Sequence, residues 1–231
     1  MVEPANVSRL YPPVRSRVCV RMVAGPKLEN WQVSRDQAIT QLDPASGTPI
    51  GDEYIFDKVF VRESTKYLYD CLVKELIKEF CKKKRSAAVI IYGCSHTGKN
   101  ECLLDTQKHD IGLLQSAFTD IVNYMAHAGD TYHLLRMSYV DVYREKVEDL
   151  LVTDLCNDTS VPKQGLQLTE DTSGYVVWLG AKEAVISSEK QLEYFYTKGH
   201  SEHVRRGHRT RGRLEAAHSI VRLVSEFQMG L

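Results

Sequence analysis

Residues 87–100 (A-A-V-I-I-Y-G-C-S-H-T-G-K-N) constrain the fold of this chain more than any other segment. The apolar run at 87–91 is typical of a strand buried on both faces of a parallel sheet. Gly93, four further residues, Gly98 and Lys99 match the spacing G-x-x-x-x-G-K, and a helix is expected to follow. In such a loop, backbone N–H groups at the helix start bind phosphate and the lysine reaches the terminal phosphates. The segment therefore predicts an α/β fold with a phosphate-binding loop.

The residue after Lys99 departs from this pattern. Ser or Thr usually stands there, because its hydroxyl binds the magnesium ion, whereas this chain has Asn100. The amide oxygen of Asn is a neutral and bulkier ligand in a crowded octahedral site, so we expect only weak metal binding at Asn100. The alternative for the whole segment is a glycine-containing turn between a strand and a helix that binds nothing.

Composition narrows the class of protein but predicts no partner. Thirty Lys and Arg residues balance 30 Asp and Glu residues, so the net charge indicates neither nucleic acid nor an acidic surface as a partner. The six cysteines lack the spacing of zinc ligands. No apolar run reaches the length of a signal peptide or a membrane span, so we expect a cytoplasmic location and no membrane association.

The pattern of apolar residues elsewhere predicts alternating strands and helices, as in an α/β fold. Strands are expected at 17–23, 54–60, 132–143, 166–168, 175–178, 184–186 and 220–227. Helices are expected from Ser64 to the basic run 82–85, over 114–125, and from a capping box of Ser188 and Gln191 to a stop at Gly199. Residues 1–15 are expected to form a flexible arm and residues 16–231 one domain.

A stretch rich in histidine and arginine follows Gly199, over residues 200–213. Three interpretations stay open. The stretch is a solvated basic loop, a basic patch for an acidic partner such as tubulin or nucleic acid, or a zinc site. For zinc the ligands would be His200, His203 and His208, and the neighbouring arginines and the lack of a nearby cysteine argue against it.

Six stretches occur along the chain in a recognisable order. They are Y-I-F-D-K-V-F (54–60), I-I-Y-G-C-S-H-T-G-K-N (90–100), G-L-L-Q-S-A-F-T-D-I-V (112–122), S-Y-V-D-V-Y-R-E-K-V-E-D-L-L (138–151), L-Q-L-T-E-D (166–171) and residues 183–188. Together they resemble the motor domain of kinesins, which are P-loop ATPases that act on microtubules. The resemblance runs from about residue 17 to 224, and the fourth stretch is the most specific.

The resemblance implies a P-loop NTPase fold of the kinesin motor type, with a central, mostly parallel sheet flanked by helices. It also implies ATP or ADP with Mg²⁺ as cofactor. The positions that would bind the nucleotide are Gly93, Cys94, Ser95, His96, Thr97, Gly98, Lys99, Asn100 and Arg21. Arg21 is what remains of the motif Arg-x-Arg-Pro that flanks the adenine, since Val23 and Ala24 replace its second Arg and its Pro.

The switch motifs of kinesins are where the resemblance weakens. The first switch reads N-x-x-S-S-R-S-H, and His218 matches its last residue. The other positions carry Arg211, Leu214, Glu215, Ala216 and Ala217. The serines that would close over the γ-phosphate and the magnesium ion are therefore replaced. The second switch would follow the strand ending near residue 227, and the sequence ends at Leu231. We therefore expect a partial motor domain that lacks its C-terminal part and the main microtubule-binding elements.

The leading hypothesis is a degenerate kinesin-like motor domain, a pseudoenzyme that binds nucleotide at best, because phosphoryl transfer depends on metal, lysine and switch residues. No catalytic residue is assigned. The alternatives are a working ATP-dependent microtubule motor, a non-enzymatic cytoskeletal scaffold that pairs with an intact motor subunit, and an incomplete reading of a longer gene. Microtubules, for which the main binding elements are absent, and a partner motor subunit are the candidate partners, on the cytoskeleton, and nucleic acid is not expected.

Overall fold

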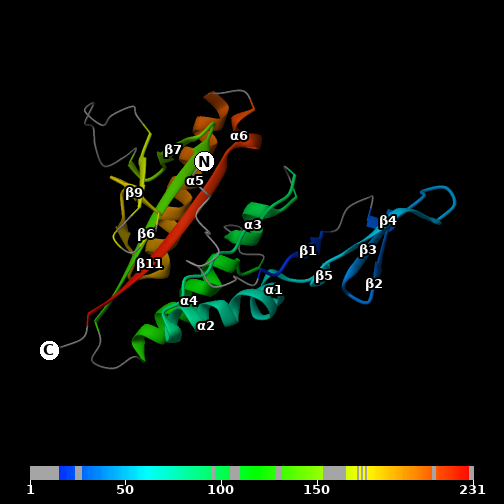
Figure 1. Cartoon of the computed structure of the whole chain (residues 1–231). Coiled ribbons are helices and arrows are strands. Elements are labelled where there is room, and N and C mark those ends of the chain that lie inside the picture. The colour runs from blue at the N-terminus through cyan, green and yellow to red at the C-terminus, as the bar shows by residue number, and fades with distance from the viewer. Residues whose placement is uncertain are drawn as a thin grey trace, which may run out of the picture. The chain divides into compact units, whose positions relative to one another are not determined.

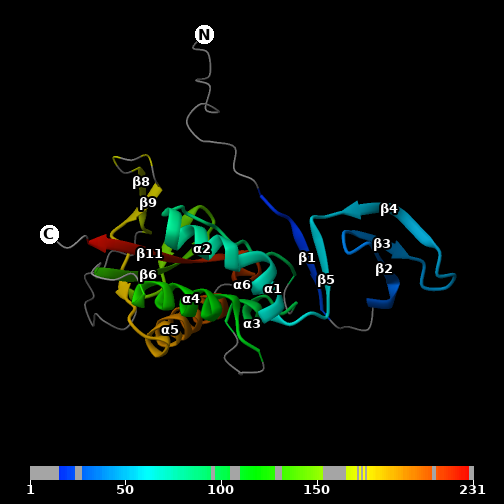
Figure 2. The same ribbon diagram turned by 90° about the horizontal axis from the view of Figure 1, so that it is seen from below.

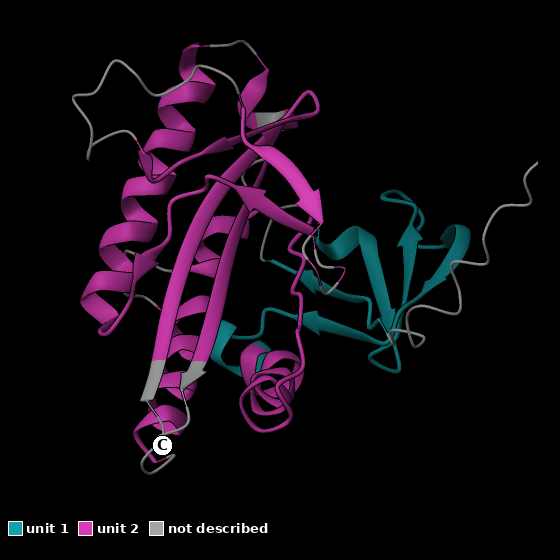
Figure 3. Cartoon of the chain, turned by 60° about the vertical axis from the view of Figure 1, so that its left-hand side comes forward, with its two compact units in different colours: residues 1–68 teal, residues 69–231 magenta. Residues whose placement is uncertain are grey.

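The computed structural model describes ten parts of the chain. They are residues 16–23, 28–94, 97–104, 110–127, 132–152, 165–170, 172, 174, 176–209 and 212–228 (Figure 1). The chain divides into two compact units, Met1–Leu68 and Tyr69–Leu231, which are coloured separately in Figure 3. The predicted arm at 1–15 lies outside the described residues.

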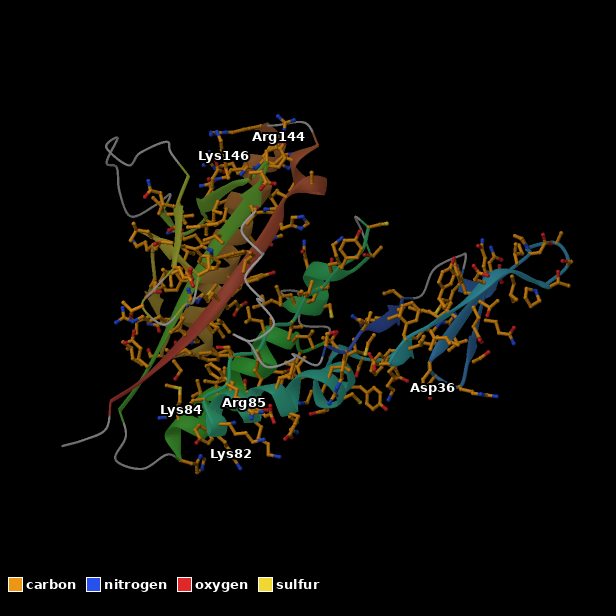
Figure 4. All side chains as sticks on the ribbon, viewed as in Figure 1. Asp36, Lys82, Lys84, Arg85, Arg144 and Lys146 are labelled. Atoms are coloured by element: carbon orange, nitrogen blue, oxygen red, sulfur yellow. The ribbon has the colours of Figure 1, made fainter. Side chains whose placement is uncertain are left out.

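Unit 1 contains two small sheets and a short helix. Its elements are β1 (Cys19–Met22), η2 (Leu28–Asn30), β2 (Trp31–Ser34), β3 (Ala38–Leu42), β4 (Pro49–Ile55), β5 (Lys58–Val61) and α1 (Thr65–Leu68). Strands β1 and β5 pair in parallel, and β2, β3 and β4 form an antiparallel sheet. Residues 35–37 connect β2 and β3, and the N–H of Gln37 donates to the carbonyl oxygen of Ser34 at 3.1 Å. The two central residues of this turn, Arg35 and Asp36, both have positive φ, as in a type I′ turn (Asp36 is labelled in Figure 4). The expected strand at 54–60 is divided in the structure, because β4 ends at Ile55 and β5 begins at Lys58.

Unit 2 is built on the long strand β6 (Tyr132–Tyr143), whose bounds are those expected from the sequence. The other strands of the unit are β7 (Lys146–Asp149), β8 (Gln167–Glu170), β9 (Val176–Leu179), β10 (Ala184–Val185) and β11 (His218–Gln228). Its helices are η3 (Tyr69–Val73), α2 (Lys74–Lys83), α3 (Lys99–Leu103), α4 (Leu113–Ala126), α5 (Glu189–Arg209) and α6 (Arg213–Ala216). β11 pairs with one edge of β6, while β7 and β10 pair with the other, and β8 and β9 form a separate hairpin.

The expected α/β fold is confirmed, but the expectation of mostly parallel pairing is not met among the described residues. Parallel pairing occurs between β1 and β5, and every described partner of β6 is antiparallel to it. The reason is local for β7, which follows β6 through a two-residue turn of Arg144 and Glu145, both with positive φ (Figure 4). A connection this short can only join antiparallel neighbours.

The core of unit 2 lies between one face of β6 and the helices α4 and α5 (Figure 2). Leu135, Met137 and Tyr139 occupy alternate positions of β6 and are almost fully buried. Alternate residues of a strand share one face, so these three side chains meet Phe118 of α4 and Leu192 of α5 on that face. Burial of such side chains is the main favourable term for this unit, at about 1.5–3 kcal/mol for each fully buried Leu, Met or Phe.

Two helix boundaries follow the expected local chemistry. The backbone N–H of Tyr67 donates to the hydroxyl of Ser64 at 3.1 Å, which confirms Ser64 as the N-cap of the first helix. At the other end of this helical stretch, Lys84 adopts a left-handed conformation with φ of 52°, and α2 ends within the basic run 82–85 (Figure 4). Cations at a helix C-terminus also favour its dipole.

The predicted stop at Gly199 is wrong, because α5 continues to Arg209. A Cβ atom at Gly199 would lie 2.2 Å from Cδ1 of Tyr139 on β6. The glycine therefore permits the helix to approach the strand closely, with the Tyr139 ring stacked on Tyr196 at 5.6 Å between centroids. Close packing and helix termination both favour glycine, and the sequence alone does not separate them.

The predicted buried strand at 87–91 is also wrong. Residues 84–94 form neither helix nor strand, and Ile90 and Tyr92 are 88% and 91% exposed. A strand buried on both faces needs a hydrogen-bonded neighbour on each side, and no described strand pairs with these residues. Their backbone groups have no described strand partner, and most of the apolar side chains face solvent.

Candidate functional site

The loop predicted to bind phosphate lies between residues 93 and 100 and leads into α3. Gly98 has φ of 80° and precedes the first residue of the helix, Lys99. The ammonium of Lys99 donates to the carbonyl oxygen of Gly93 at 2.5 Å and also to that of Cys94. The hydroxyl of Thr97 donates to the same Cys94 oxygen at 2.8 Å. The loop is therefore closed on itself, with its lysine at the centre.

The structure brings together six of the expected nucleotide-binding residues in this loop: Gly93, Cys94, Thr97, Gly98, Lys99 and Asn100. Ser95 and His96 lie outside the described residues. Arg21 belongs to β1 in unit 1, where its guanidinium donates to the carbonyl oxygen of Glu63 at 3.1 Å. His218 is the exposed first residue of β11, opposite Val142 of β6.

Glu101, which is not part of the phosphate-loop motif, places a negative charge beside the loop. It lies in the first turn of α3, and its Oε2 would be 3.9 Å from a Cβ atom at Gly98. An acidic residue in the first turn interacts favourably with the helix dipole, but it repels an anion at the same place. The sequence signal was present, since Glu101 follows directly after the motif.

The loop fits a phosphate better than it fits a magnesium ion. Asn100 is exposed and offers a neutral amide oxygen, whereas Mg²⁺ is usually bound through carboxylates and substrate phosphates in octahedral geometry. Within the described ranges, no group of three or more His, Cys, Asp and Glu side chains is arranged to hold a metal ion. Lys99 supplies a positive charge that suits phosphate, so the donor set favours the anion over the metal.

A cluster of charged side chains joins α5 and α6 to β6 and β7, and we call it the ion-pair cluster. Its members are Asp141, Glu148, Glu202, His203, Arg205, Arg206 and Arg213. At its centre is the fully buried carboxylate of Asp141, which accepts from Nη2 of Arg213 at 2.9 Å and lies 3.2 Å from Nδ1 of His203. Arg213 also donates to Glu148 of β7.

Arg206 connects the remaining part of the ion-pair cluster. Its Nε donates to Glu202 at 2.7 Å, its Nη1 to Glu148 at 3.2 Å, and its Nη2 to the carbonyl oxygen of Asp149 at 2.9 Å. Arg205 pairs with the other side of Glu202 at 2.5 Å. Each buried carboxylate of the cluster therefore meets at least two donors, which offsets the desolvation of its charge.

The pKa values of the buried carboxylates reflect this pairing. Burial raises the pKa of Asp141, but the hydrogen bonds from His203 and Arg213 outweigh it, and the pKa lies below its usual value. Burial likewise raises the pKa of Glu202, and the hydrogen bonds from Arg205 and Arg206 bring it below the usual value. Both side chains are therefore carboxylates at neutral pH.

The ion-pair cluster fixes α6, which lies in the segment where the sequence predicts the remnant of a first switch. Arg213 begins α6 and lies over the ring of Tyr143 at 4.9 Å, in addition to its two carboxylate partners. Leu214 packs against Gly207 of α5, where a Cβ atom would lie only 2.0 Å from its Cγ. The segment thus forms a short helix held by charge and close packing.

The interpretation of residues 200–213 as a solvated basic loop is wrong. Residues 200–209 belong to α5, and Arg206 and Arg213 are directed at carboxylates within unit 2. His200 stacks on Tyr196, and burial, followed by the charge of His203, lowers the pKa of its imidazole. The carboxylates that neutralise these arginines come from β6 and β7, about 60 residues earlier in the chain, so local composition gave no sign of them.

The described part of the chain contains no helix that is long and apolar enough to span a membrane.

The family model described as the kinesin motor domain matches residues 20–228 of the chain. Among curated proteins, the chain is 29% identical over 183 residues to the kinesin-like protein KIN-7N of Arabidopsis thaliana, covering 76% of the chain and 21% of that protein. It is 26% identical over 197 residues to the kinesin-like protein KIN-7L of Oryza sativa subsp. japonica, covering 85% of the chain and 29% of that protein.

The fold is similar to the solved structure of a fast kinesin, with a TM-score of 0.74 and 17% sequence identity. The match covers 90% of this chain and 59% of that structure. The chain therefore spans less than a third of the two curated relatives and somewhat more than half of the solved motor.

Proposed function

The chain belongs to the kinesin motor domain family, and we propose that it is a degenerate motor domain that binds ADP or ATP through the phosphates and hydrolyses ATP poorly or not at all. Kinesin motor domains in general bind ATP and ADP with Mg²⁺ and bind microtubules. The proposal separates the binding of phosphate from the hydrolysis of ATP, because the residues for the two are preserved to different degrees.

The closed loop around Lys99 supports the binding of phosphate. The ammonium lies within hydrogen-bond distance of two loop carbonyls, so the cation is already held against the loop. Gly98 keeps the left-handed conformation that starts α3. A terminal phosphate could exchange the carbonyl partners of Lys99 for its own oxygens, which form stronger, charge-assisted hydrogen bonds.

The single observation that carries the second half of the proposal is that residues 214, 216 and 217, where the first switch has Ser, Arg and Ser, carry neither a hydroxyl nor a guanidinium. In the family, the first switch closes over the γ-phosphate and magnesium, and Arg213 stands within the matching segment. Here its guanidinium is held by Asp141 and Glu148. Loss of one electrostatic donor typically costs about 2.7–4 kcal/mol in the barrier. With Asn100 at the metal position, several such donors are missing together.

Glu101 adds a charge that opposes the phosphates. Two charges roughly 6 Å apart in water interact by about 0.7 kcal/mol, which corresponds to about threefold in affinity. Replacement by glutamine keeps the size of the side chain and removes the charge. The variant E101Q should therefore bind ADP about threefold more tightly than the wild type, by the same estimate.

We test the proposal on the full chain by calorimetric titration with ADP and ATP, with and without Mg²⁺, and by phosphate release with and without microtubules. We expect ADP binding that is nearly independent of Mg²⁺, weaker binding in K99A, and phosphate release at the background rate. Restoring the hydroxyl in N100T should make ADP binding respond to Mg²⁺. Co-sedimentation with microtubules measures whether the family's usual partner is retained.

Two results would overturn the proposal in different ways. Microtubule-stimulated phosphate release that disappears in K99A would establish a working motor, the main alternative. Absence of ADP and ATP binding in the wild type, with the protein folded, would leave a non-enzymatic scaffold as the better description. K99M serves as a second control, because it keeps most of the unbranched side chain and removes its charge.

A further inference from the structure

Helix α2 is rich in cations along its outer side and at its end. The stretch from residue 74 to residue 85 reads K-E-L-I-K-E-F-C-K-K-K-R, with six cations and two carboxylates. All six cationic residues are exposed, and Figure 4 shows three of them together at the end of the helix. We call these residues the basic surface of α2: Lys74, Lys78, Lys82, Lys83, Lys84 and Arg85.

The period of the helix explains why the lysines face outward. Ile77 and Cys81 are four residues apart and pack against the core of unit 2. Lys74, Lys78 and Lys82 recur with the same spacing, so they lie on one stripe of the helix. This stripe is displaced by one residue from the apolar one, or about 100° around the helix axis. Packing of the apolar stripe therefore holds the lysine stripe toward solvent.

Carboxylates compensate the basic surface only in part. Lys74 and Lys78 each pair with an acidic residue three or four positions earlier. At the end of the helix one carboxylate, that of Glu79, lies 2.8 Å from Lys83 and 3.8 Å from Arg85. Lys82 forms no ion pair with any described residue. Positive charge is therefore in excess at the end of α2.

The helix dipole does not account for this excess. The C-terminal end of a helix carries the equivalent of about half a negative charge, and its effect is confined to the last turn. Lys82 and Lys83 stand in that turn, and Lys84 follows it. A single cation would already balance the dipole. The remaining charges create a positive field that attracts an extended anionic surface.

We propose that the basic surface of α2 binds the surface of a membrane rich in anionic phospholipids. Clusters of about 4–8 Lys and Arg residues on a helix bind such surfaces, and each cation strengthens binding about fivefold. Four charges in excess correspond to about 600-fold over an uncharged membrane. The expectation of no membrane association follows from the lack of a long apolar run, whereas binding through charge needs no such run.

Two features favour a lipid surface over nucleic acid. The carboxylates of Glu75 and Glu79 stand between the lysines, and they would repel phosphates that a nucleic acid backbone holds at fixed spacing. Lipids diffuse within the membrane, so anionic head groups can gather beneath the cations and avoid the carboxylates. Single-strand-binding proteins also stack bases on aromatic side chains. The one aromatic residue of this stretch, Phe80, packs against the core.

The experiment measures co-sedimentation of the full chain with vesicles of phosphatidylcholine that contain about 30% phosphatidylserine. We expect binding at about 0.1 M salt, loss of binding at about 1 M salt, where charges are screened within about 3 Å, and none to phosphatidylcholine alone. The variant K82Q/K83Q/R85Q should bind roughly a hundredfold more weakly. Lys84 is left unchanged because its backbone is left-handed, with φ of 52°.

A matched control removes the same number of exposed cations from other parts of unit 2. K146Q/K190Q/R209Q should bind the vesicles like the wild type, and far-ultraviolet circular dichroism should show both triple variants folded. Titration of duplex DNA in the same buffer tests the other class of polyanion. The proposal is refuted by a wild type that does not bind the anionic vesicles, whether or not it binds DNA. Undiminished vesicle binding by folded K82Q/K83Q/R85Q refutes it as well.

Discussion

Replacement of Arg213 by methionine removes the cation that Asp141 and Glu148 share. Asp141 is the critical partner, because its side chain is completely buried while that of Arg213 is 11% exposed. Removing one member of a buried ion pair costs about 3–5 kcal/mol, since it leaves the other charge without compensation. His203 still lies 3.2 Å from Asp141, and Arg206 still pairs with Glu148. We therefore expect a loss near the lower limit, about 3 kcal/mol.

The two tryptophans of the chain make this loss measurable in unit 2 alone. Trp31 belongs to β2 of unit 1, and Trp178 belongs to β9 of unit 2. In a W31F background, the fluorescence of Trp178 reports the unfolding of unit 2. For a domain of 150–250 residues, 1 kcal/mol shifts the melting temperature by about 2–4 °C, so R213M should melt about 6–12 °C lower.

A double-mutant cycle separates the ion pair from the packing of the arginine stem. D141N removes the buried charge, so the effect of R213M should be smaller in that background, with a coupling of about 1–3 kcal/mol between neighbours. A single R213M loss below about 0.5 kcal/mol would show that the pair behaves like an exposed one. Strictly additive losses would show that Arg213 acts through packing alone. Either result refutes the argument that charge anchors α6.

Three further predictions concern unit 2. G199A should destabilise it by up to about 2 kcal/mol in urea unfolding, because the clash with Tyr139 costs about 1–3 kcal/mol and helix propensity returns about 1 kcal/mol. The pKa values of Asp141 and Glu202 are lowered in the folded protein. Their contribution to stability is therefore complete above the ordinary carboxyl pKa of about 4, and it is lost as the pH falls below that value. Melting curves between pH 7 and pH 3 will measure this loss. Burial, the largest cause, raises the pKa of Tyr139 to about 12, so ultraviolet titration should find it un-ionised at pH 11.

The elements that could be predicted from sequence are those whose signal is local. β6 is marked by a twelve-residue run rich in aromatic and aliphatic residues that favour strands, and Ser64 marks the helix start through its own hydroxyl. The loop at 93–100 is local too, and its lysine and glycines lie together as the spacing requires. In each case the residues that determine the structure are within a few positions of one another.

The features that escaped prediction depend on residues far apart in the chain. Gly199 is adjacent to Tyr139, 60 positions earlier, and only that contact distinguishes a packing glycine from a helix stop. From the local sequence Arg213 belongs to a basic loop, whereas in the structure its guanidinium donates to Asp141 and Glu148. The run at 87–91 has the composition of a central strand, but strand formation also needs neighbours, which no local pattern reports.

The core and the loop at 93–100 depend on different residues, and this separation explains how the fold can persist while the loop changes. The buried cluster of unit 2 is made by β6, α2, α4 and α5, together with residues such as Leu104 and Leu150. Gly93, Cys94, Thr97 and Asn100 are exposed and take no part in it. Substitution at Asn100 therefore leaves the buried apolar surface unchanged, and a surface substitution usually alters stability by no more than about 0.5 kcal/mol. Under the proposed function the same position would hold the metal, and loss of one such electrostatic contact changes a rate by orders of magnitude. Stability therefore places little constraint on the loop, and a test of N100T should find restored metal dependence without a change in melting temperature.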